Sequence, residues 1–497
     1  MPPSKKYKIL FVTSEVVPFI KTGSLGDVSS SLPQKLQELG HQVRIVVPKY
    51  GAIDERKYKI HEVVRLKDLK TQIGKNEVIY SLRSSFLVGS KARVQLYFLD
   101  NEEYFGSRRS IYADPMTGKY YKDNDERYIL LSKSVFELIS KLGWIPDIIH
   151  CNDWQGGLIP VYLKTLFKDV EKFKSIKTVF TIHNFANQGI YPKSTFAKTG
   201  LPDNLNKESS ILSKGKVNFL KAGIKFADTI TTVSKTYASE ITKHKDLSNE
   251  LFPVIKSRAK DLHGIVNGID ANVWNPEKDK QITKKYSIKN LELKKANKKT
   301  LVEKFGLTYD ENKPVIGLIS NLTENKGLDL IQKSFNDLMK LDAQFILLGS
   351  GDKKYQTFLE KSFNKHSNKF ALYLGFDNQL AHLIEAGADM FLMPSKVEPC
   401  GLNQMYSLVY GTIPIVRATG GLADTVIDYS KDPQKGNGFV FQKYDPKALL
   451  AAVKKAIELF NNDKKSWLKL QKNGMKSNFT WLNSSKLYVN LYKKIVG

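Results

Sequence analysis

Short runs of apolar, mostly β-branched residues alternate along the whole chain with segments of helical periodicity. In the first half these runs occupy residues 9–12, 43–47, 94–99, 148–150, 179–183 and 229–233. In the second half they occupy residues 315–319, 345–348, 371–374, 390–393 and 413–416. Strands that alternate with helices indicate a parallel sheet, and continuously apolar strands are typical of a sheet covered on both faces. The chain is therefore predicted to form two doubly wound α/β sheets.

The junction between the two series follows the sequence HGIVNGIDANVWNP, after which a lysine-rich segment at residues 278–304 opens the second half. This organisation predicts two domains of similar size that face each other across a cleft. Ligands of doubly wound sheets bind beyond the carboxyl ends of the strands, so such a cleft can hold a donor and an acceptor. The length of 497 residues and the hydrophobic content of 41% allow each domain a sizeable core.

Charge and cysteine content narrow the class of protein. The net charge is +27, but the lysines are scattered and no aromatic–basic motif is present, so we expect no nucleic-acid partner. Cys151 and Cys400 lie far apart, which argues against a disulfide framework and fits a reducing cytoplasm. Ser14 and Glu15 interrupt the first apolar run, which reads as a strand and not as a signal peptide. No stretch approaches the roughly 20 apolar residues that a membrane span needs.

A glycine-rich segment, KTGSLGD, follows the first predicted strand and begins at Lys21. Its backbone N–H groups can approach a ligand closely, and Lys21 suits a phosphate or a sugar phosphate. An ordinary tight turn explains the same glycines, because one glycine-rich turn is weak evidence for a ligand. Asp27 can cap the helical pattern that follows. Pro33 requires that this helix either begin near Ser31 or bend.

Two polar motifs follow later strands of the first half. The sequence HCNDWQGG places Asp153 beside Trp154, a carboxylate and a flat apolar face that together can hold a sugar. A capped helix start with a core tryptophan explains this motif equally well. His183 and Asn184 close another strand, with Gln188 shortly after. A lone histidine is more often structural, but these polar neighbours favour a functional interpretation.

Two further motifs follow strands of the second half. In NLTENKGLD, Lys326 precedes a helix and is placed for an anion, although a solvated loop lysine is the simpler interpretation. In EPCGLNQ, Gly401 precedes a helix start whose amides, those of Leu402 and Asn403, suit a pyrophosphate. Phosphate would repel the carboxylate of Glu398, so a sugar hydroxyl is its natural partner. The sequence TGGLADT follows. Each motif alone is modest, but all of them lie at strand ends of the predicted cleft.

The motifs KTGSLGDV, HCNDW, TIHN, NFLKAG, NGID, WNP, KGLDL, EPCGL and RATGGLADTV occur in the order and spacing of one family. Over about residues 7–495 the chain resembles the bacterial glycogen synthases and plastid starch synthases. The resemblance implies the GT-B glycosyltransferase fold, an α/β architecture of two Rossmann-like doubly wound domains facing across a cleft. It implies an acceptor and catalytic domain at residues 1–270, a nucleotide-sugar domain at 271–480, and a helix within 481–497 that crosses back to the first domain.

The resemblance also implies an activity. Enzymes of this family transfer glucose from ADP-glucose, or sometimes UDP-glucose, to the non-reducing end of an α-1,4-glucan such as glycogen or a malto-oligosaccharide. They retain the anomeric configuration and need no metal or cofactor. Lys326 would neutralise the leaving diphosphate, the backbone carbonyl of His183 would face the anomeric carbon, and Phe376 would stack on the base.

The resemblance assigns four catalytic residues and a larger substrate-binding set. The catalytic residues are Asp153, His183, Lys326 and Glu398. The substrate-binding residues are Lys21, Gly23, Ser24, Asp27, Asn184, Gln188, Asn267, Asn321, Phe376, Cys400, Gly401, Leu402, Asn403, Gly420 and Gly421. The oligomeric state does not follow from the sequence.

The sequence departs from the family pattern near the expected chemistry. The family usually carries glycine at Ser24, histidine at Asn152, tyrosine at Asn187 and arginine at Lys396 and Asn321. Loss of a charge-assisted bond of about 1.5–3 kcal/mol at Asn321 would slow transfer roughly 10- to 150-fold if the bond acts only in the transition state. Three hypotheses therefore remain: an active α-glucan synthase, a weak or inactive glucan-binding relative, and a GT-B enzyme with another donor or acceptor.

Overall fold

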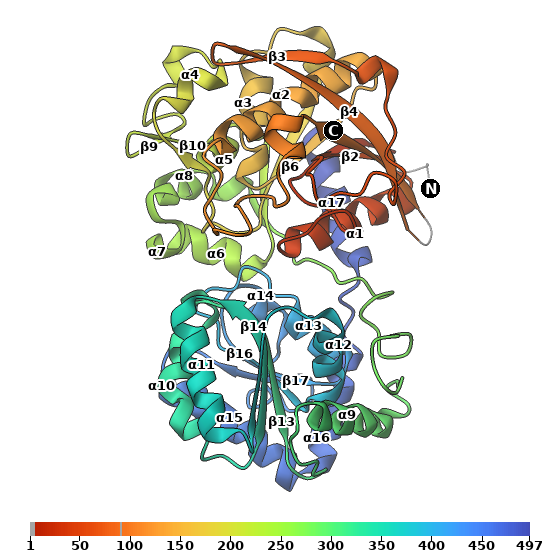
Figure 1. The fold of residues 1–497 in the computed structure, drawn as a ribbon, viewed down its shortest axis with the longest axis vertical. Coiled ribbons are helices and arrows are strands. Elements are labelled where there is room, and N and C mark those ends of the chain that lie inside the picture. Colours follow the sequence, from red (N-terminus) through yellow and green to blue (C-terminus); the bar gives the residue numbers. More distant parts are fainter. Residues whose placement is uncertain (1–4, 90–91) are drawn as a thin grey trace. The chain divides into compact units, whose positions relative to one another are not determined.

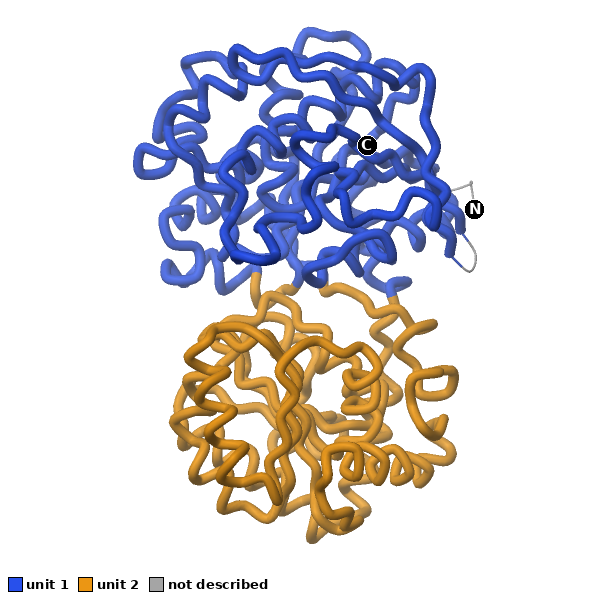
Figure 2. The backbone as a smooth tube through the Cα atoms, viewed as in Figure 1, with its two compact units in different colours: residues 1–233, 238–265, 481–497 blue, residues 234–237, 266–480 orange. Residues whose placement is uncertain are grey.

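A mainly parallel sheet organises each of the two units into which the chain divides (Figure 2). The computed structural model describes residues 5–89 and 92–497. Unit 1 comprises residues 1–233, 238–265 and 481–497, and unit 2 comprises residues 234–237 and 266–480. The carboxyl-terminal segment therefore belongs to the same unit as the amino-terminal half of the chain.

The main sheet of unit 1 is parallel except at one edge (Figure 1). In sheet order, its strands are β12 (Leu262–Gly264), β11 (Thr229–Thr232), β7 (Lys177–Ile182), β6 (Ile148–Asn152), β1 (Lys8–Val12), β2 (Gln42–Pro48), β5 (Arg93–Asp100), β4 (Asn76–Val88) and β3 (Leu69–Ile73). Strand β4 runs antiparallel to both of its neighbours. A small separate sheet contains β8 (Ile190–Tyr191), β10 (Lys216–Asn218) and β9 (Leu212–Ser213).

The six apolar runs predicted as strands in the first half coincide with β1, β2, β5, β6, β7 and β11, within a residue or two at their ends. The antiparallel edge was not predicted. Strand β4 buries alternate residues and exposes much of its other face, so its apolar residues do not form a continuous run. The prediction of a doubly wound α/β sheet is confirmed.

Helices cover the sheet of unit 1 and form its periphery. They are α1 (Ser24–Glu38), α2 (Asn124–Leu142), α3 (Leu158–Lys164), α4 (Thr195–Thr199), α5 (Phe219–Phe226), α7 (Lys245–Ser248), α8 (Phe252–Ser257), α17 (Trp481–Val496) and most of α6 (Lys235–Lys243), whose first three residues belong to unit 2. Helix α1 begins at Ser24 and continues through Pro33, so the alternative start near Ser31 is wrong. Asp27 lies in its first turn and is not its cap, a position that Gly23 occupies. Pro33 forgoes one backbone hydrogen bond, and its ring is buried in the unit.

The last helix, α17, is fixed to the sheet of unit 1 by a buried histidine. His150 on β6 bonds through Nδ1 to the hydroxyl of Tyr492 at 2.8 Å and through Nε2 to that of Thr181 at 2.6 Å. Burial lowers the pKa of His150 to about 3, so the imidazole is neutral at physiological pH. Tyr488 and Tyr492 lie four residues apart on the buried face of α17 and both pack near this ring.

Unit 2 is built on a fully parallel sheet. In sheet order, its strands are β15 (Phe370–Leu374), β14 (Gln344–Gly351), β13 (Val315–Leu322), β16 (Met390–Met393), β17 (Ile413–Arg417) and β18 (Phe439–Phe441). Its helices are α9 (Lys294–Lys304), α10 (Leu328–Leu338), α11 (Lys353–His366), α12 (Asn378–Gly387), α13 (Asn403–Val409), α14 (Gly420–Thr425), α15 (Pro446–Asn462) and α16 (Lys464–Met475). The five strands predicted for the second half are all present.

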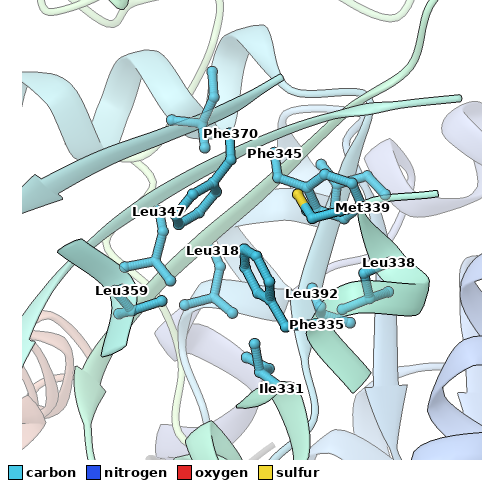
Figure 3. Close-up of a pocket in the computed structure, with 12 residues that line it drawn as sticks. Leu318, Ile331, Phe335, Leu338, Met339, Phe345, Leu347, Leu359, Phe370 and Leu392 are labelled. Carbon is cyan, nitrogen blue, oxygen red and sulfur yellow. The ribbon is translucent and has the colours of Figure 1, made fainter. Parts of the chain in front are cut away.

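Both faces of the unit 2 sheet are buried, as its apolar strands predict. Along β14, Leu347 packs into one core cluster, whereas Ile346 and Leu348 pack into the cluster on the other face. A cavity of about 30 Å³ within the first cluster is lined solely by apolar side chains, including Leu318 and Phe335 (Figure 3). Without a polar group to orient a ligand, this cavity belongs to the core packing. None of the helices in the described ranges has the length and apolar composition that a bilayer crossing requires.

Candidate active site

Four of the predicted motifs lie at the topological switch points of the two sheets, and the motifs of His183 and Gly420 follow the neighbouring strands β7 and β17. In unit 1 the strand order reverses between β1 and β6, and in unit 2 it reverses between β13 and β16. Ligands of open α/β sheets bind at the carboxyl ends of the strands on either side of such a point. The segments that follow these four strands contain Lys21, Asp153, Lys326 and Glu398. Each unit therefore presents its candidate residues where its topology favours a ligand.

The loop after β1 is shaped by a buried carboxylate. Glu15, 3% exposed, accepts hydrogen bonds from the backbone N–H groups of Thr22 and Gly23, the latter at 3.1 Å, and from the Thr22 hydroxyl at 3.0 Å. Burial raises the pKa of Glu15, and these donors oppose the shift. Lys21 projects from the same loop and pairs with Asp27 at 2.6 Å. Glu15 therefore fixes the loop that presents Lys21 and Gly23.

Asp153, immediately after β6, combines a strained backbone with a perturbed carboxyl group. Its φ of +51° is rare for a residue with a side chain. Its Oδ1 accepts the backbone N–H of His183 at 2.7 Å. Burial of the carboxyl group raises its pKa to about 7, although hydrogen bonds from the amides of His183 and Asn184 oppose the shift. Such a shift at a strand end is typical of functional sites.

The hydrogen bonds of His183 define which of its ring nitrogens carries the proton. The side-chain amide of Asn152 donates to the carbonyl of Val12 at 3.0 Å, so its Oδ1 is an acceptor toward His183 Nε2, also at 3.0 Å. Nε2 therefore bears the hydrogen, and Nδ1 is an acceptor. Burial lowers the pKa of His183 to about 3, which keeps the ring neutral. Nδ1 is buried without a partner among the described residues, and it is available to a hydroxyl donor of a ligand.

The other residues predicted in unit 1 differ in whether their side chains already form hydrogen bonds within the chain. Ser24 is the exposed first residue of α1. Asn184 accepts the N–H of Ala186 at 2.9 Å and forms a turn. Gln188 is buried, and its carbonyl oxygen accepts the amide of Asn218 at 2.8 Å. Gln188 thus supports the local fold, and its role toward a ligand remains a prediction.

Three polar residues near Asp153 were not among the predicted site residues. The hydroxyl of Tyr112 bonds to Ser14 Oγ and to Gln155 Nε2, both at 2.8 Å. The other amide atom of Gln155, Oε1, is buried without a partner among the described residues. Ser14, like Glu15, follows β1, so its place at a strand end was a usable signal. Tyr112 lies in a long irregular segment that no periodicity singles out.

Two of the residues predicted to be catalytic in unit 2, Lys326 and Glu398, form an ion pair. Lys326 Nζ lies 2.7 Å and 2.6 Å from the two carboxylate oxygens of Glu398, which also accepts the hydroxyl of Ser395 at 3.0 Å. Glu398 is 4% exposed, whereas the Lys326 side chain is 32% exposed. The lysine therefore keeps one side open to an anion while it compensates a buried carboxylate.

The EPCGL and TGG segments pack directly against each other. A Cβ at Gly420 would collide with the carbonyl oxygen of Glu398, and one at Gly421 would collide with that of Cys400. Only glycines permit this approach. Gly401 has a φ of +71° and precedes α13, whose first residue, Asn403, donates its side-chain amide to the carbonyl of Ile319 at 3.0 Å.

Cys400 and Asn267 lie beside this segment. Burial raises the pKa of Cys400 to about 12, and the backbone N–H of Asn267 opposes the shift. The thiol is therefore protonated and acts as a small polar group, and not as a nucleophile. Asn267 is 3% exposed, and its Oδ1 has no partner among the described residues. This orphaned acceptor is a second polar atom that a bound ligand can satisfy.

The remaining candidates of unit 2 are exposed. The backbone of Asn321 pairs with that of Ser350 where β13 and β14 end. Phe376 follows β15 and is 77% exposed, which leaves its ring free to stack on a ligand. Lys396 pairs with Glu324 at 2.8 Å. Among the described residues, no group of three or more His, Cys, Asp and Glu side chains is arranged to hold a metal ion.

Two family models match the chain. The starch synthase catalytic domain matches residues 8–256, and glycosyl transferases group 1 matches residues 300–476. These matches cover the parts of the sequence that carry the motifs of unit 1 and unit 2, respectively.

Curated relatives match over the full length. The chain is 42% identical to the glycogen synthase of Thermosipho africanus over 99% of both chains. It is 41% identical to that of Desulforudis audaxviator, over 98% of this chain and 96% of the relative. It is also 42% identical to the glycogen synthase of Thermotoga maritima, over 99% of both chains.

Solved structures agree with this relationship. The catalytic domain of starch synthase IV from Arabidopsis thaliana, bound to ADP and acarbose, is 31% identical with a TM-score of 0.88 over 99% of this chain and all of that one. Sucrose-phosphate synthase from Thermosynechococcus elongatus, 16% identical with a TM-score of 0.59, shares the fold. The full-length matches, the GT-B fold and the motifs at the switch points agree, and the chain belongs to the glycogen synthase and starch synthase family.

Proposed function

We propose that this chain is a retaining glucosyltransferase that extends an α-1,4-glucan in glycogen synthesis, with ADP-glucose as its donor. The observation that carries the proposal is its full-length similarity to glycogen synthases together with polar, partly unpartnered groups at strand ends of unit 1 and beside the EPCGL segment of unit 2. The structure of starch synthase IV with ADP and acarbose supports an adenine nucleotide and a glucan-like ligand. The two cysteines are free and buried, which supports a cytoplasmic location.

In this proposal, unit 2 stabilises the leaving group. The bond between the anomeric carbon and the diphosphate oxygen breaks, and negative charge develops on the diphosphate. Lys326, the amides of Leu402 and Asn403 and, from unit 1, Lys21 are the groups that would compensate this charge. Glu398 would accept hydrogen bonds from glucose hydroxyls, and Phe376 would stack on the base. The nucleotide sugar is then the only small molecule that the reaction requires besides the acceptor.

Unit 1 would orient the sugar and the acceptor. The acceptor's 4-hydroxyl oxygen forms the new bond to the anomeric carbon, and its proton passes to the leaving diphosphate. The unprotonated Nδ1 of His183 would accept a hydrogen bond from a glucose hydroxyl, because Asn152 holds the ring in that tautomer. The backbone carbonyl of His183 would face the anomeric carbon and stabilise its positive charge, and Asp153 would hold the amide of His183 in place.

The test is glucose transfer by the full chain. ADP-glucose and UDP-glucose are supplied separately, with and without glycogen, and both nucleotide release and incorporation of labelled glucose into glycogen are measured. We expect release that depends on glycogen and is faster with ADP-glucose. The labelled product should be degraded by an α-1,4-specific amylase. Transfer that is faster with UDP-glucose would overturn the choice of donor, and a product resistant to the amylase would overturn the linkage.

One observation favours a second candidate function, a weak or inactive glucan-binding protein. Asn321 stands where the family carries an arginine. The preceding residue on β13, Ser320, and the partner of Asn321 on β14, Ser350, are both uncharged. If neither donor supports transfer while the chain still binds glycogen, this second function would replace the first.

A further inference from the structure

A hollow of about 410 Å³ lies on unit 2, outside the residues assigned to the reaction. It is formed by the segment between α14 and β18, with Tyr429 and Ser430, and by the last turns of α15. Its volume falls within the range of about 300–1,000 Å³ that is typical of small-molecule sites. The hollow is therefore large enough for a ligand of the size of short sugar chains.

The hollow lies at the opposite end of the sheet from the candidate active-site residues. Its floor includes Phe439, the first residue of β18, which pairs in parallel with Ile415, the middle residue of β17. Helix α15 follows β18 and returns, so its last turns reach the amino ends of the strands. Lys326 and Glu398 follow the carboxyl ends of β13 and β16. A ligand in the hollow cannot take part in the reaction at those residues.

The floor of the hollow contains the half-buried ring of Tyr429, which packs against the buried ring of Phe439. The rings of Tyr429 and Phe439 lie 5.9 Å apart at an angle of 53°. The segment that carries Tyr429 is held in shape: its N–H donates to the carbonyl of Gly438 at 2.8 Å, and the side chain of Asn473 donates to the carbonyls of Gln434 and Gly436. The aromatic surface is therefore preformed, which lowers the entropic cost of binding.

Polar side chains on the rim of the hollow are not used by the protein itself. Lys455, Glu458 and Asn462 lie three or four residues apart, which places them on one face of α15 together with the half-buried Leu459. Within the described residues, neither these three side chains nor the hydroxyl of Tyr429 makes a hydrogen bond or ion pair with the chain. Donors and acceptors thus surround an aromatic floor.

The chemistry of these groups points to a neutral, polyhydroxylated ligand. Glu458 and Asp463 offset the charge of Lys455, so a phosphate would meet carboxylates as well as the one lysine. Sugar hydroxyls can bond to a carboxylate, an amide and an ammonium group at once, and the apolar face of a sugar ring can pack on Tyr429. We propose that this hollow binds a segment of an α-1,4-glucan chain, a proposal that rests on the function proposed above.

Such a site would tether the acceptor polymer. A glycogen particle held at the hollow keeps its other chain ends near the enzyme, which raises their effective concentration without any change at the reacting groups. The site would therefore affect the use of glycogen and leave the use of short malto-oligosaccharides unchanged. This difference separates it from the acceptor residues at the active site.

The helix offers a closely matched control. Lys454 and Asn461 have the same residue types and the same seven-residue spacing as Lys455 and Asn462, and all four residues are exposed, but the first two do not line the hollow. The test compares Lys455→Ala/Asn462→Ala with Lys454→Ala/Asn461→Ala in the full chain. Both double variants remove one positive charge and one amide, so their effects on net charge and helix propensity are the same.

Glycogen affinity is measured by electrophoresis in gels that contain glycogen, and KM is measured separately for glycogen and for maltotriose. We expect the hollow variant to bind glycogen about 5- to 10-fold more weakly than the control variant and to show a similar rise in KM for glycogen. Its kcat and its KM for maltotriose should not change. Equal glycogen affinity in the two variants, or a wild type that glycogen does not retard, would overturn the proposal.

The same experiment distinguishes this proposal from the proposed function. If the wild type transfers glucose but both variants bind glycogen equally, only the hollow has been misassigned. If the wild type transfers no glucose but is retarded by glycogen, and the hollow variant loses this retardation, the glucan site stands and the transferase function fails. Glu458→Ala serves as a further variant, because it removes a polar group from the rim without reducing the aromatic floor.

Discussion

The buried candidate residues of unit 1 and the Lys326–Glu398 pair of unit 2 handle charge in opposite ways. In unit 1, the buried His183 is held neutral, and burial raises the pKa of Asp153 to about 7, so these two groups tend toward their uncharged forms. In unit 2, Lys326 and Glu398 form a close ion pair, with the lysine still partly exposed. The difference fits the roles proposed for the two units, because neutral buried groups can bond to sugar hydroxyls, whereas a departing diphosphate needs fixed positive charge.

The comparison also shows how each unit preserves its arrangement. Unit 1 uses hydrogen bonds between buried groups and the backbone, as Glu15 does with the loop at Thr22 and Gly23 and as Asp153 does with the amide of His183. Unit 2 uses close backbone packing, which Gly420 and Gly421 permit, and one ion pair. We therefore expect the stability of unit 1 to depend on pH, and the activity that unit 2 supports to depend on a single charged side chain.

The largest expected effect concerns pH and Asp153. Its folded-state pKa of about 7 lies above its ordinary value of about 4, so the folded state binds this proton more tightly than the unfolded state. Its contribution to stability is full below pH 4 and is lost as the pH rises through 7. Relative to Asp153→Asn, the wild type should lose at most about 4 kcal/mol of unfolding free energy over this window.

This prediction is checked by urea unfolding of both proteins at intervals between pH 4.5 and pH 8, values that roughly span the titration of the buried carboxyl group. The exposed Asp342, substituted in the same way, provides the control and should show no pH-dependent difference. A difference between wild type and Asp153→Asn that does not vary with pH would mean that the carboxyl group of Asp153 is not desolvated.

Sequence reasoning predicted the sheets and the motifs better than the groups that support them. The strands were recognisable because each is a continuous apolar run, and Lys326 and Glu398 were recognisable because they follow such runs. The partnership of Asn152 with His183 could not be predicted, because it depends on the register between β6 and β7. The hydrogen bonds of Tyr112 could not be predicted either, because the segment that carries this residue has no periodicity that would place it beside Gln155.

The next largest effect is expected on kcat when the positive charge of Lys326 in unit 2 is removed. Lys326→Ala should lower kcat about 10²- to 10³-fold, because it removes a cation that would act on the leaving diphosphate. It also leaves the buried Glu398 without its partner, so the melting temperature should fall. Lys326→Arg should retain much of the activity. Lys333→Ala, an exposed lysine on α10, is the matched control and should behave as the wild type. A kcat within 3-fold of the wild type would break the proposed division between the units.

A gain of activity is expected from Asn321→Arg. The residue is exposed at the end of β13, so a guanidinium group can be accommodated there. If the missing charge acts only in the transition state, kcat should rise roughly 10- to 150-fold. Asn312→Arg, on an exposed turn before β13, adds the same charge away from the strand end and should have no effect. An unchanged kcat for Asn321→Arg would show that other groups in this chain already supply the charge.

The smallest expected effect tests the positioning role of Glu15. Glu15→Gln keeps an oxygen in place of Oε2, the atom that accepts the N–H groups of both Thr22 and Gly23, but it loses the negative charge that strengthens these bonds. The loop that presents Lys21 should become less ordered, and KM for the nucleotide sugar should rise about 5-fold while KM for the acceptor does not change. Glu77→Gln, which alters an exposed pair with Lys70, is the control. If the donor and acceptor KM values rise together, Glu15 supports the fold of unit 1 as a whole and does not position the donor loop.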